Sequence, residues 1–356
     1  MFTNPSDIVI TEPILPIVPD AAWEAEVKRV MGMVPLYMRR IAPSPWLRGV
    51  CMDWTTYQFD ALPRRLADIG FLVTSQENSC RYCYGVARAS MRLLGYSEQL
   101  ITRIEREAQL AELDPGERAF IAFCRNLARS NPRPSRAARE ELMALGFSPL
   151  EVAEMAFMIA SYCFGNRITT LLACPPEAAL EGLAKGWLGK LLRPLIANQL
   201  RRRPLPRKES GRSAATLSPI ARALEGLPAA ALLQDTLDAA FASPLISARA
   251  KALMFGVIAR TLDCRFCEND MIERLAQSGM SNAAVQASLA SLSDPDLGPA
   301  EAPLLAWARD TVRYHTLDIQ QRTHALLHQI GAERTLEAVG VAALANATVR
   351  LAMLLE

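Results

Sequence analysis

The chain has 356 residues, of which 51% are hydrophobic and 6% aromatic. This length exceeds what one ordinary core needs and predicts two domains, and the many Ala, Leu and Arg residues favour helices over strands. The net charge of +2 is close to neutral, which gives the molecule as a whole no electrostatic reason to bind nucleic acid.

Residues 1–20 form a proline-rich N-terminal arm with early acidic residues, which is not typical of a signal peptide. No uninterrupted apolar run reaches the roughly 18 residues of a membrane span. Eight cysteines occur, and those outside the two CxxC pairs lie in apolar surroundings, as buried free thiols usually do. We therefore expect a cytoplasmic protein in a reducing environment.

From Ala21 onward, apolar residues recur at three- and four-residue spacing and are interrupted by Pro, Gly or capping residues. This periodicity predicts a series of helices and no strands. The expected helices of the first half are 21–40, 46–60, 63–77, 80–94, 97–110, 115–130, 135–145 and 148–173.

A basic linker is expected at 181–216, because residues 185–212 contain nine Lys or Arg and a single acidic residue, Glu209. Its first part, GWLGKLLRPLIANQLRRR, has an apolar face and contains Pro194. Two interpretations stay open: a helix that lies on an anionic membrane surface, or a helix that packs across the two domains and leaves its basic end in solvent.

The second half repeats the pattern of the first. Its expected helices are 219–242, 247–261, 264–278, 282–292, 299–313, 318–330 and 333–354. The sequence thus predicts an all-α protein of two tandem helical bundles, a first repeat at 21–180 and a second repeat at 217–356.

The strongest sign of duplication is a dithiol motif that occurs twice, CRYC at 80–83 and CRFC at 264–267. The offset of 184 residues also aligns other identical or similar side chains. These pairs are Arg65 with Arg249, Pro115 with Pro299, Glu117 with Glu301, Phe123 with Trp307, Arg125 with Arg309 and Arg129 with Arg313.

Each pair of cysteines is expected in the first turn of a helix, with Ser79 or Asp263 as the N-cap. The unpaired N–H groups at a helix start lower the pKa of a thiol there. Residues three apart share one helical face, so the two sulfurs can close a disulfide. This arrangement suits a two-electron cycle in which one cysteine attacks and the other resolves.

Two plainer interpretations of the cysteines are weighed against this one. CxxC is also half of a zinc site, but the histidines, His315, His324 and His328, all lie in the second repeat. His324 and His328 share a helical face, so a Cys/His site remains open there. Alternatively, the cysteines only fill space in the core.

Each repeat resembles the helical core of AhpD-type alkylhydroperoxidases and carboxymuconolactone decarboxylases. The resemblance rests on MGMVPLYMRRIAPSP, VTSQENSCRYCYG, LDPGERAFIAF and LGFSPLEVAEMAFMIASYCFGNRITTLL in the first repeat, which it covers from about 21 to 180. The second repeat matches the central motif and the helices after it, and its ends match less closely.

The resemblance implies that Cys83 attacks a hydroperoxide and Cys80 resolves, with a lipoyl or thioredoxin-like carrier as reductant. It also implies a homo-oligomer and no bound cofactor. The family glutamate is here Asp68, and its counterpart in the second repeat is Ala252. The family histidine is replaced by Ala in the first repeat and by Met in the second, at positions 87 and 271, so the usual proton relay is incomplete.

Other side chains near the first dithiol are candidates to compensate. Glu77 is a possible proton carrier, and the guanidinium of Arg88 favours a thiolate by its charge. Acidic residues surround Cys264 and Cys267, and neighbouring carboxylates raise a thiol's pKa. We therefore expect the first pair to be the more reactive one. The acidic neighbours of the second pair are Asp263, Glu268 and Asp270.

The preferred hypothesis is a dithiol peroxidase or thiol–disulfide oxidoreductase that acts on organic hydroperoxides. A lactone decarboxylase of the carboxymuconolactone type is a second hypothesis, although its chemistry needs no dithiol. The third is a helical redox-sensing or ligand-binding module without catalysis.

Overall fold

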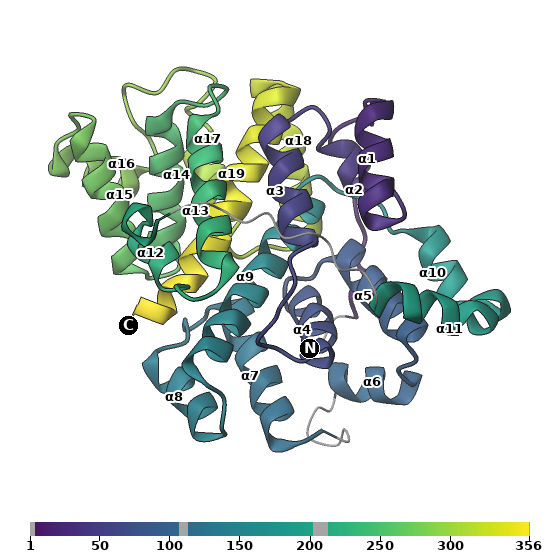
Figure 1. Ribbon diagram of the computed structural model, residues 1–356. Coiled ribbons are helices and arrows are strands. Elements are labelled where there is room, and N and C mark those ends of the chain that lie inside the picture. Colours follow the sequence, from purple (N-terminus) through teal and green to yellow (C-terminus); the bar gives the residue numbers. More distant parts are fainter. Residues whose placement is uncertain (1–3, 107–112, 202–212, 356) are drawn as a thin grey trace.

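The computed structural model of the protein describes residues 4–106, 113–201 and 213–355. Within these residues helices are the only regular secondary structure, which confirms the predicted all-α class (Figure 1). The expected end of the helix at 97–110 and residues 202–212 of the basic linker lie outside the described residues.

The helices of the first repeat follow the predicted order closely. The expected helix at 21–40 is two helices, because the chain turns at Gly32, whose φ of 80° ends the first of them. The observed elements are η1 (Pro5–Asp7), α1 (Ala21–Met31), α2 (Leu36–Arg40), α3 (Pro45–Thr55), α4 (Arg64–Glu77), α5 (Arg81–Leu94), α6 (Glu98–Arg106), α7 (Pro115–Arg129), α8 (Arg136–Ala144) and α9 (Pro149–Leu171).

The described parts of the linker region and of the second repeat are also helical. The expected helix at 219–242 is broken near Gly226, whose φ is 92°. The elements are α10 (Ala178–Lys185), α11 (Trp187–Arg201), η3 (Ala214–Thr216), α12 (Pro219–Arg222), α13 (Pro228–Ala242), α14 (Ala248–Thr261), α15 (Arg265–Gln277), α16 (Asn282–Ser291), α17 (Leu304–Asp310), α18 (Thr316–Ile330), α19 (Ala332–Leu351) and η4 (Ala352–Leu355).

Local sequence fixes where two of the central helices begin. The side chain of Asp114 accepts a hydrogen bond from the N–H of Glu117, whose carboxylate in turn accepts one from the Asp114 N–H at the start of α7. Ser148 and Glu151 form the same reciprocal arrangement at the start of α9. These capping boxes satisfy N–H groups that have no partner within the helix.

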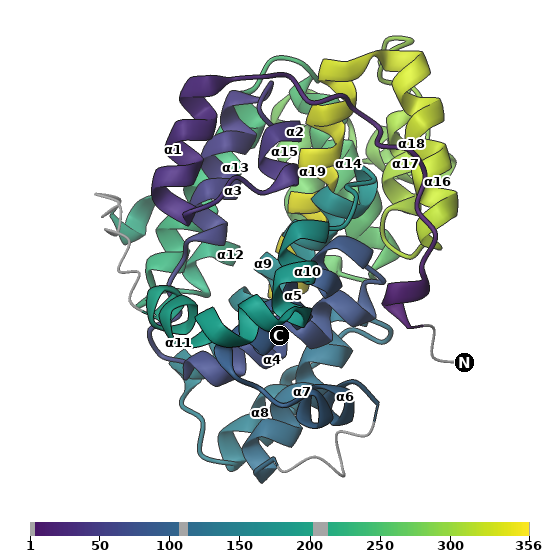
Figure 2. The ribbon, with the colours of Figure 1, turned by 90° about the vertical axis from the view of Figure 1, so that its right-hand side faces the viewer.

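The two repeats share one hydrophobic core. The last helix of each repeat, α9 and α19, is buried along most of its length, and the two pack against each other at the centre of the molecule (Figures 1 and 2). Helix α3 of the first repeat also packs on α13 of the second. Buried residues of both repeats form a single continuous cluster.

Two buried arginines join the repeats reciprocally. Arg167 on α9 donates hydrogen bonds to the carbonyls of Thr311 (3.3 Å) and Val312 (3.2 Å) just after α17. Arg350 on α19 donates to the carbonyl of Ala128 (3.2 and 3.1 Å) at the end of α7. Each arginine thus supplies donors to helix-terminal carbonyls of the other repeat that have no partner within their own helix.

Helix α19 together with η4 is long and apolar enough to cross a membrane by length and composition alone. Within the apolar window of this segment, 94% of the residues are buried inside the protein. This segment is therefore buried in the described structure as a core helix is.

Candidate active site

Each CxxC motif lies at a tight turn between two packed helices, α4 and α5 in the first repeat and α14 and α15 in the second. The predicted N-caps are wrong. Ser79 and Asp263 adopt left-handed conformations, with φ of 50° and 53°, and the N-caps are Cys80 and Cys264 themselves. A left-handed residue leads out of the preceding helix, so the next residue takes the capping position.

The sulfurs of the first pair are held close together. The N–H of Cys83 donates to the Sγ of Cys80 at 3.2 Å. The hydroxyl of Thr169 on α9 lies 3.1 Å from the Sγ of Cys80 and 3.2 Å from that of Cys83. Both cysteines are buried and free. The pair is therefore enclosed, and the hydroxyl of Thr169 contacts both of its sulfurs.

The two thiols of this pair differ in acidity. Burial raises the pKa of Cys80, but hydrogen bonds with the Cys83 thiol, with Thr169 and with the Cys83 N–H outweigh burial and lower it from the usual 9.0 to about 7. Burial and the neighbouring Cys80 sulfur raise the pKa of Cys83 well above 9.0. The first thiolate to form is therefore that of Cys80.

A buried carboxylate, that of Glu177, contacts the CxxC motif through Tyr82, which lies between the two cysteines. Glu177 accepts hydrogen bonds from the hydroxyl of Tyr82 and from the N–H of Leu36, both at 2.6 Å. The ring of Tyr37 packs edge-on against that of Tyr82 at 6.0 Å between centroids. Burial raises the pKa of Tyr37 well above 10.0. Sequence reasoning did not identify Glu177 or Thr169, because both are far from the CxxC motif along the chain.

The three predicted accessory residues of the first repeat have partners elsewhere on the bundle. Asp68 accepts a hydrogen bond from Tyr96 at 3.0 Å. Glu77 forms ion pairs with arginines of α7 at 3.5 and 2.5 Å. Arg88 pairs with two glutamates of α6, Glu105 at 3.3 Å and Glu98. Their roles at the dithiol remain predictions.

The second pair repeats the geometry of the first. The N–H of Cys267 donates to the Sγ of Cys264 at 3.4 Å, and both residues are buried and free. The guanidinium of Arg133, from the segment between α7 and α8 of the first repeat, hydrogen-bonds Cys264 and acts on it by its charge. The first repeat therefore supplies a cation to the dithiol of the second.

The expected order of reactivity stays a prediction, and the second pair also contains a thiol of lowered pKa. The hydrogen bond with Cys267 is the largest cause that lowers the pKa of Cys264, and with Arg133 it brings the value from 9.0 to about 6. Hydrogen bonding to Cys264 and burial raise the pKa of Cys267 well above 9.0. The carboxylate of Glu268 is paired with Arg260 at 2.6 Å. The acidic neighbours thus do not prevent a thiolate at Cys264.

Each dithiol turn is covered by the other repeat. Over the first turn, Tyr314 donates from its hydroxyl to the carbonyl of Asn78 at 3.3 Å, and Thr316 to that of Ser79 at 3.1 Å. Near the second turn, Arg313 bridges to the carbonyl of Ser130 in the first repeat at 3.0 Å. The segment after α17 of the second repeat therefore lies over the first dithiol turn, and the segment after α7 of the first repeat lies near the second.

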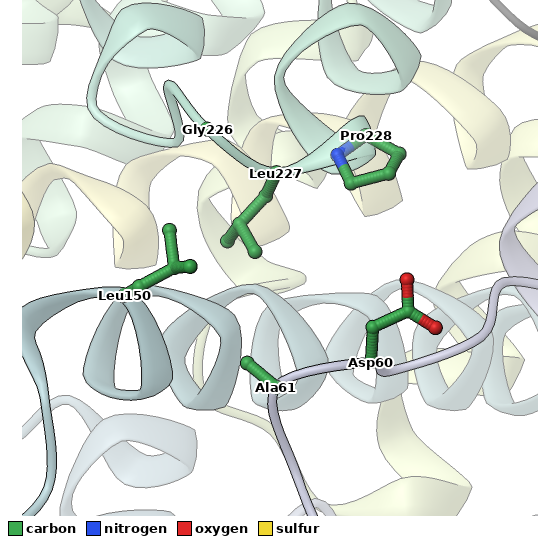
Figure 3. A pocket seen from close by; sticks show the side chains of 6 residues that line it. All are labelled: Asp60, Ala61, Leu150, Gly226, Leu227 and Pro228. Carbon is green, nitrogen blue, oxygen red and sulfur yellow. The ribbon is translucent and has the colours of Figure 1, made fainter.

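Two surface hollows occur in the described part of the chain. One, of about 390 Å³, lies at the segment between α17 and α18 and is lined in part by Tyr314. The other, of about 550 Å³, lies between the start of α13 and the loop before α4; Figure 3 shows Asp60 and Leu150 facing Leu227 and Pro228 across it. The hollow of about 390 Å³ is lined by the same segment, after α17, whose Tyr314 contacts the turn before Cys80.

The zinc interpretation gains no support from the described residues, where no group of three or more His, Cys, Asp or Glu side chains is placed to hold a metal ion. The ring of His324 lies 3.0 Å from the carbonyl oxygen of Glu12 in the N-terminal arm. This contact gives the histidine a structural partner.

No family model and no curated protein matches the chain. Solved structures do match. One is the alkylhydroperoxidase AhpD core of an uncharacterized peroxidase-related protein from Ralstonia eutropha JMP134, with 19% identity and a TM-score of 0.44, covering 50% of this chain and 99% of that one. Another is an uncharacterized peroxidase-related protein from Silicibacter sp. TM1040, with 22% identity, a TM-score of 0.41 and coverage of 51% and 98%.

Proposed function

We propose that the protein is a dithiol peroxidase that reduces organic hydroperoxides and is regenerated by a carrier dithiol of the lipoyl or thioredoxin type. The observation that carries this proposal is the geometry of the two CxxC turns. In each, one sulfur accepts an N–H from the first turn of a helix and lies beside a second, free thiol. This cycle requires an attacking thiolate and a resolving thiol in contact with it.

The reaction balances with these groups alone. The Cys80 thiolate attacks the distal oxygen of ROOH, the O–O bond breaks, and the sulfur is oxidised to a sulfenic acid as RO⁻ leaves and takes a proton to become ROH. The thiol of Cys83 then attacks the sulfenic sulfur, which forms the disulfide and releases water. A carrier dithiol reduces the disulfide by exchange and is itself oxidised to its disulfide.

The proposed roles differ from those that the family resemblance implies. Cys80 is the attacking thiolate because its pKa is lowered, and Cys83 resolves because it keeps its proton. In the second repeat Cys264 and Cys267 take the same roles. A proton for the departing alkoxide is available at the hydrogen-bonded pair of Tyr82 and Glu177 in the first repeat.

Access to the buried sulfurs requires movement of the covering segments. Thr316 and Tyr314 each donate one hydrogen bond to a carbonyl of the first turn, which contributes about 1 kcal/mol net. Tyr314 also contacts Thr170 and the guanidinium of Arg167 on α9, and these contacts break as well when the segment opens. We propose that the hydroperoxide enters from the side of the hollow of about 390 Å³, which Tyr314 lines in part. The same movement admits the carrier dithiol.

The test is a hydroperoxide reduction assay with cumene hydroperoxide and a dihydrolipoyl or thioredoxin regenerating system. We expect turnover in the wild type, partial loss in Cys80→Ser and in Cys264→Ser, and complete loss in the double variant. Cys124→Ser, which alters a buried free thiol outside both motifs, is the matched control and keeps full activity. Unchanged turnover in the double variant refutes the proposal.

A further inference from the structure

Helix α11 presents a row of large apolar side chains to solvent. Trp187 is 75% exposed, Leu191 66% and Leu195 68%, and Leu188 is exposed by 43%. At 100° per residue these four positions fall within one sector of about 100° of the helix. Figure 2 shows α11 on the near side of the molecule, outside α5 and α10. The helix thus carries an apolar face that the described chain does not cover.

The opposite face of the same helix is firmly packed. Ile196 joins Leu180 of α10 and the buried Ala89 and Leu93 of α5 in a small separate core. A side chain on Gly189 would clash with the carbonyl of Leu183, so this glycine allows α11 to approach α10 closely. Packing therefore fixes the rotation of α11, and the exposure of its apolar row does not come from a loosely attached helix.

Positive charge surrounds the apolar row. Lys185 at the end of α10 and Lys190 on α11 are both exposed. Arg193 on α11 adds a third basic residue. A second copy of the chain docked on this face about a two-fold axis would bring these cations of the two copies together, and they would repel. The charge instead complements an anionic surface.

We propose that α11 is a membrane-surface anchor that lies in the headgroup region of a bilayer containing anionic lipids. Its apolar row enters the acyl boundary, Trp187 sits at the interface, where Trp is favoured, and the lysines contact lipid phosphates. Each basic side chain near such a surface strengthens binding about fivefold. The proposal does not depend on peroxidase activity.

The experiment is flotation of the full-length protein with vesicles of phosphatidylcholine alone or of phosphatidylcholine with about one phosphatidylglycerol in three lipids. We expect binding only to the anionic vesicles, with release as salt is raised. Leu191→Glu is expected to lower the partition coefficient by about tenfold or more, because a leucine loses its apolar burial. Lys190→Gln is expected to lower it about fivefold.

Leu145→Glu is the matched control, because Leu145 is a 46% exposed apolar residue that follows α8, away from α11. It is expected to bind like the wild type. Circular dichroism and thermal unfolding verify that each variant is folded. Absence of binding to anionic vesicles overturns the proposal. A dimer in light scattering that Leu191→Glu dissociates also overturns it, because the apolar row is then covered by a second copy.

Discussion

The contact between Arg133 and Cys264 gives a prediction that joins the two repeats. Replacing Arg133 by Gln removes the positive charge from the first repeat but leaves the Cys267 hydrogen bonds, which contribute more to the low pKa of Cys264. Loss of an adjacent opposite charge moves a pKa by about 1 or more. We therefore expect the pKa of Cys264 to rise from about 6 to about 7.

The consequence at neutral pH is measurable. A thiol with a pKa of about 6 is roughly nine-tenths ionised at pH 7, and one with a pKa of about 7 is half ionised. The assay is the pH dependence of iodoacetamide alkylation, followed by mass spectrometry, in a Cys80→Ser/Cys83→Ser background that leaves the second pair. Because the acid form is unreactive, the midpoint of the rate moves to higher pH in the variant.

The matched control is Leu317→Gln, which changes an exposed residue at the corresponding position of the second repeat, 184 residues further along. This variant should leave unchanged the pH at which the alkylation rate of Cys264 is half-maximal. A midpoint near 9 in the unmutated second pair, or no change on removal of Arg133, would refute the reasoning that a cation from one repeat stabilises the thiolate of the other.

Three further predictions follow from buried polar contacts. Thr169→Val removes the hydroxyl beside both sulfurs of the first pair, and we expect the alkylation midpoint of Cys80 to rise above about 7. Lys251→Met leaves the buried Glu337 carboxylate without its cation, since the two are joined at 2.8 Å. The free energy of unfolding should fall by about 3–5 kcal/mol in urea titrations. Adding Glu337→Gln should restore only part of it, because Lys251 also donates to the carbonyls of Ala240 and Ser243. Arg350→Met should cost about 3 kcal/mol or more in the same titrations, because it leaves buried carbonyls without donors. An unchanged urea midpoint in either single variant would contradict these assignments.

Much of the fold was predictable because helix signals are local. Apolar spacing and capping residues located α4, α5, α7 and α9 to within about two residues. The exceptions are breaks at glycines that adopt positive φ, such as Gly32 and Gly226. A glycine permits this conformation without requiring it, so the sequence does not show which glycine ends a helix.

The candidate site was predictable only in part. The CxxC spacing identified both dithiols, but the residues that set their acidity come from distant segments. Thr169 lies about 90 residues from the first motif, and Arg133 belongs to the other repeat. Such contacts depend on how α9 and α19 bring the repeats together, which periodicity does not reveal. The capping role of Cys80 was missed because Ser79 is the better N-cap residue by type.

The central claim is that both CxxC pairs cycle between dithiol and disulfide. The most direct test is peptide mass spectrometry after addition of one equivalent of cumene hydroperoxide per pair, under conditions that block thiol exchange. The account predicts disulfides within Cys80–Cys83 and within Cys264–Cys267, with the remaining cysteines reduced. Free thiols in both pairs, or oxidation that falls instead on the cysteines outside the motifs, would contradict it.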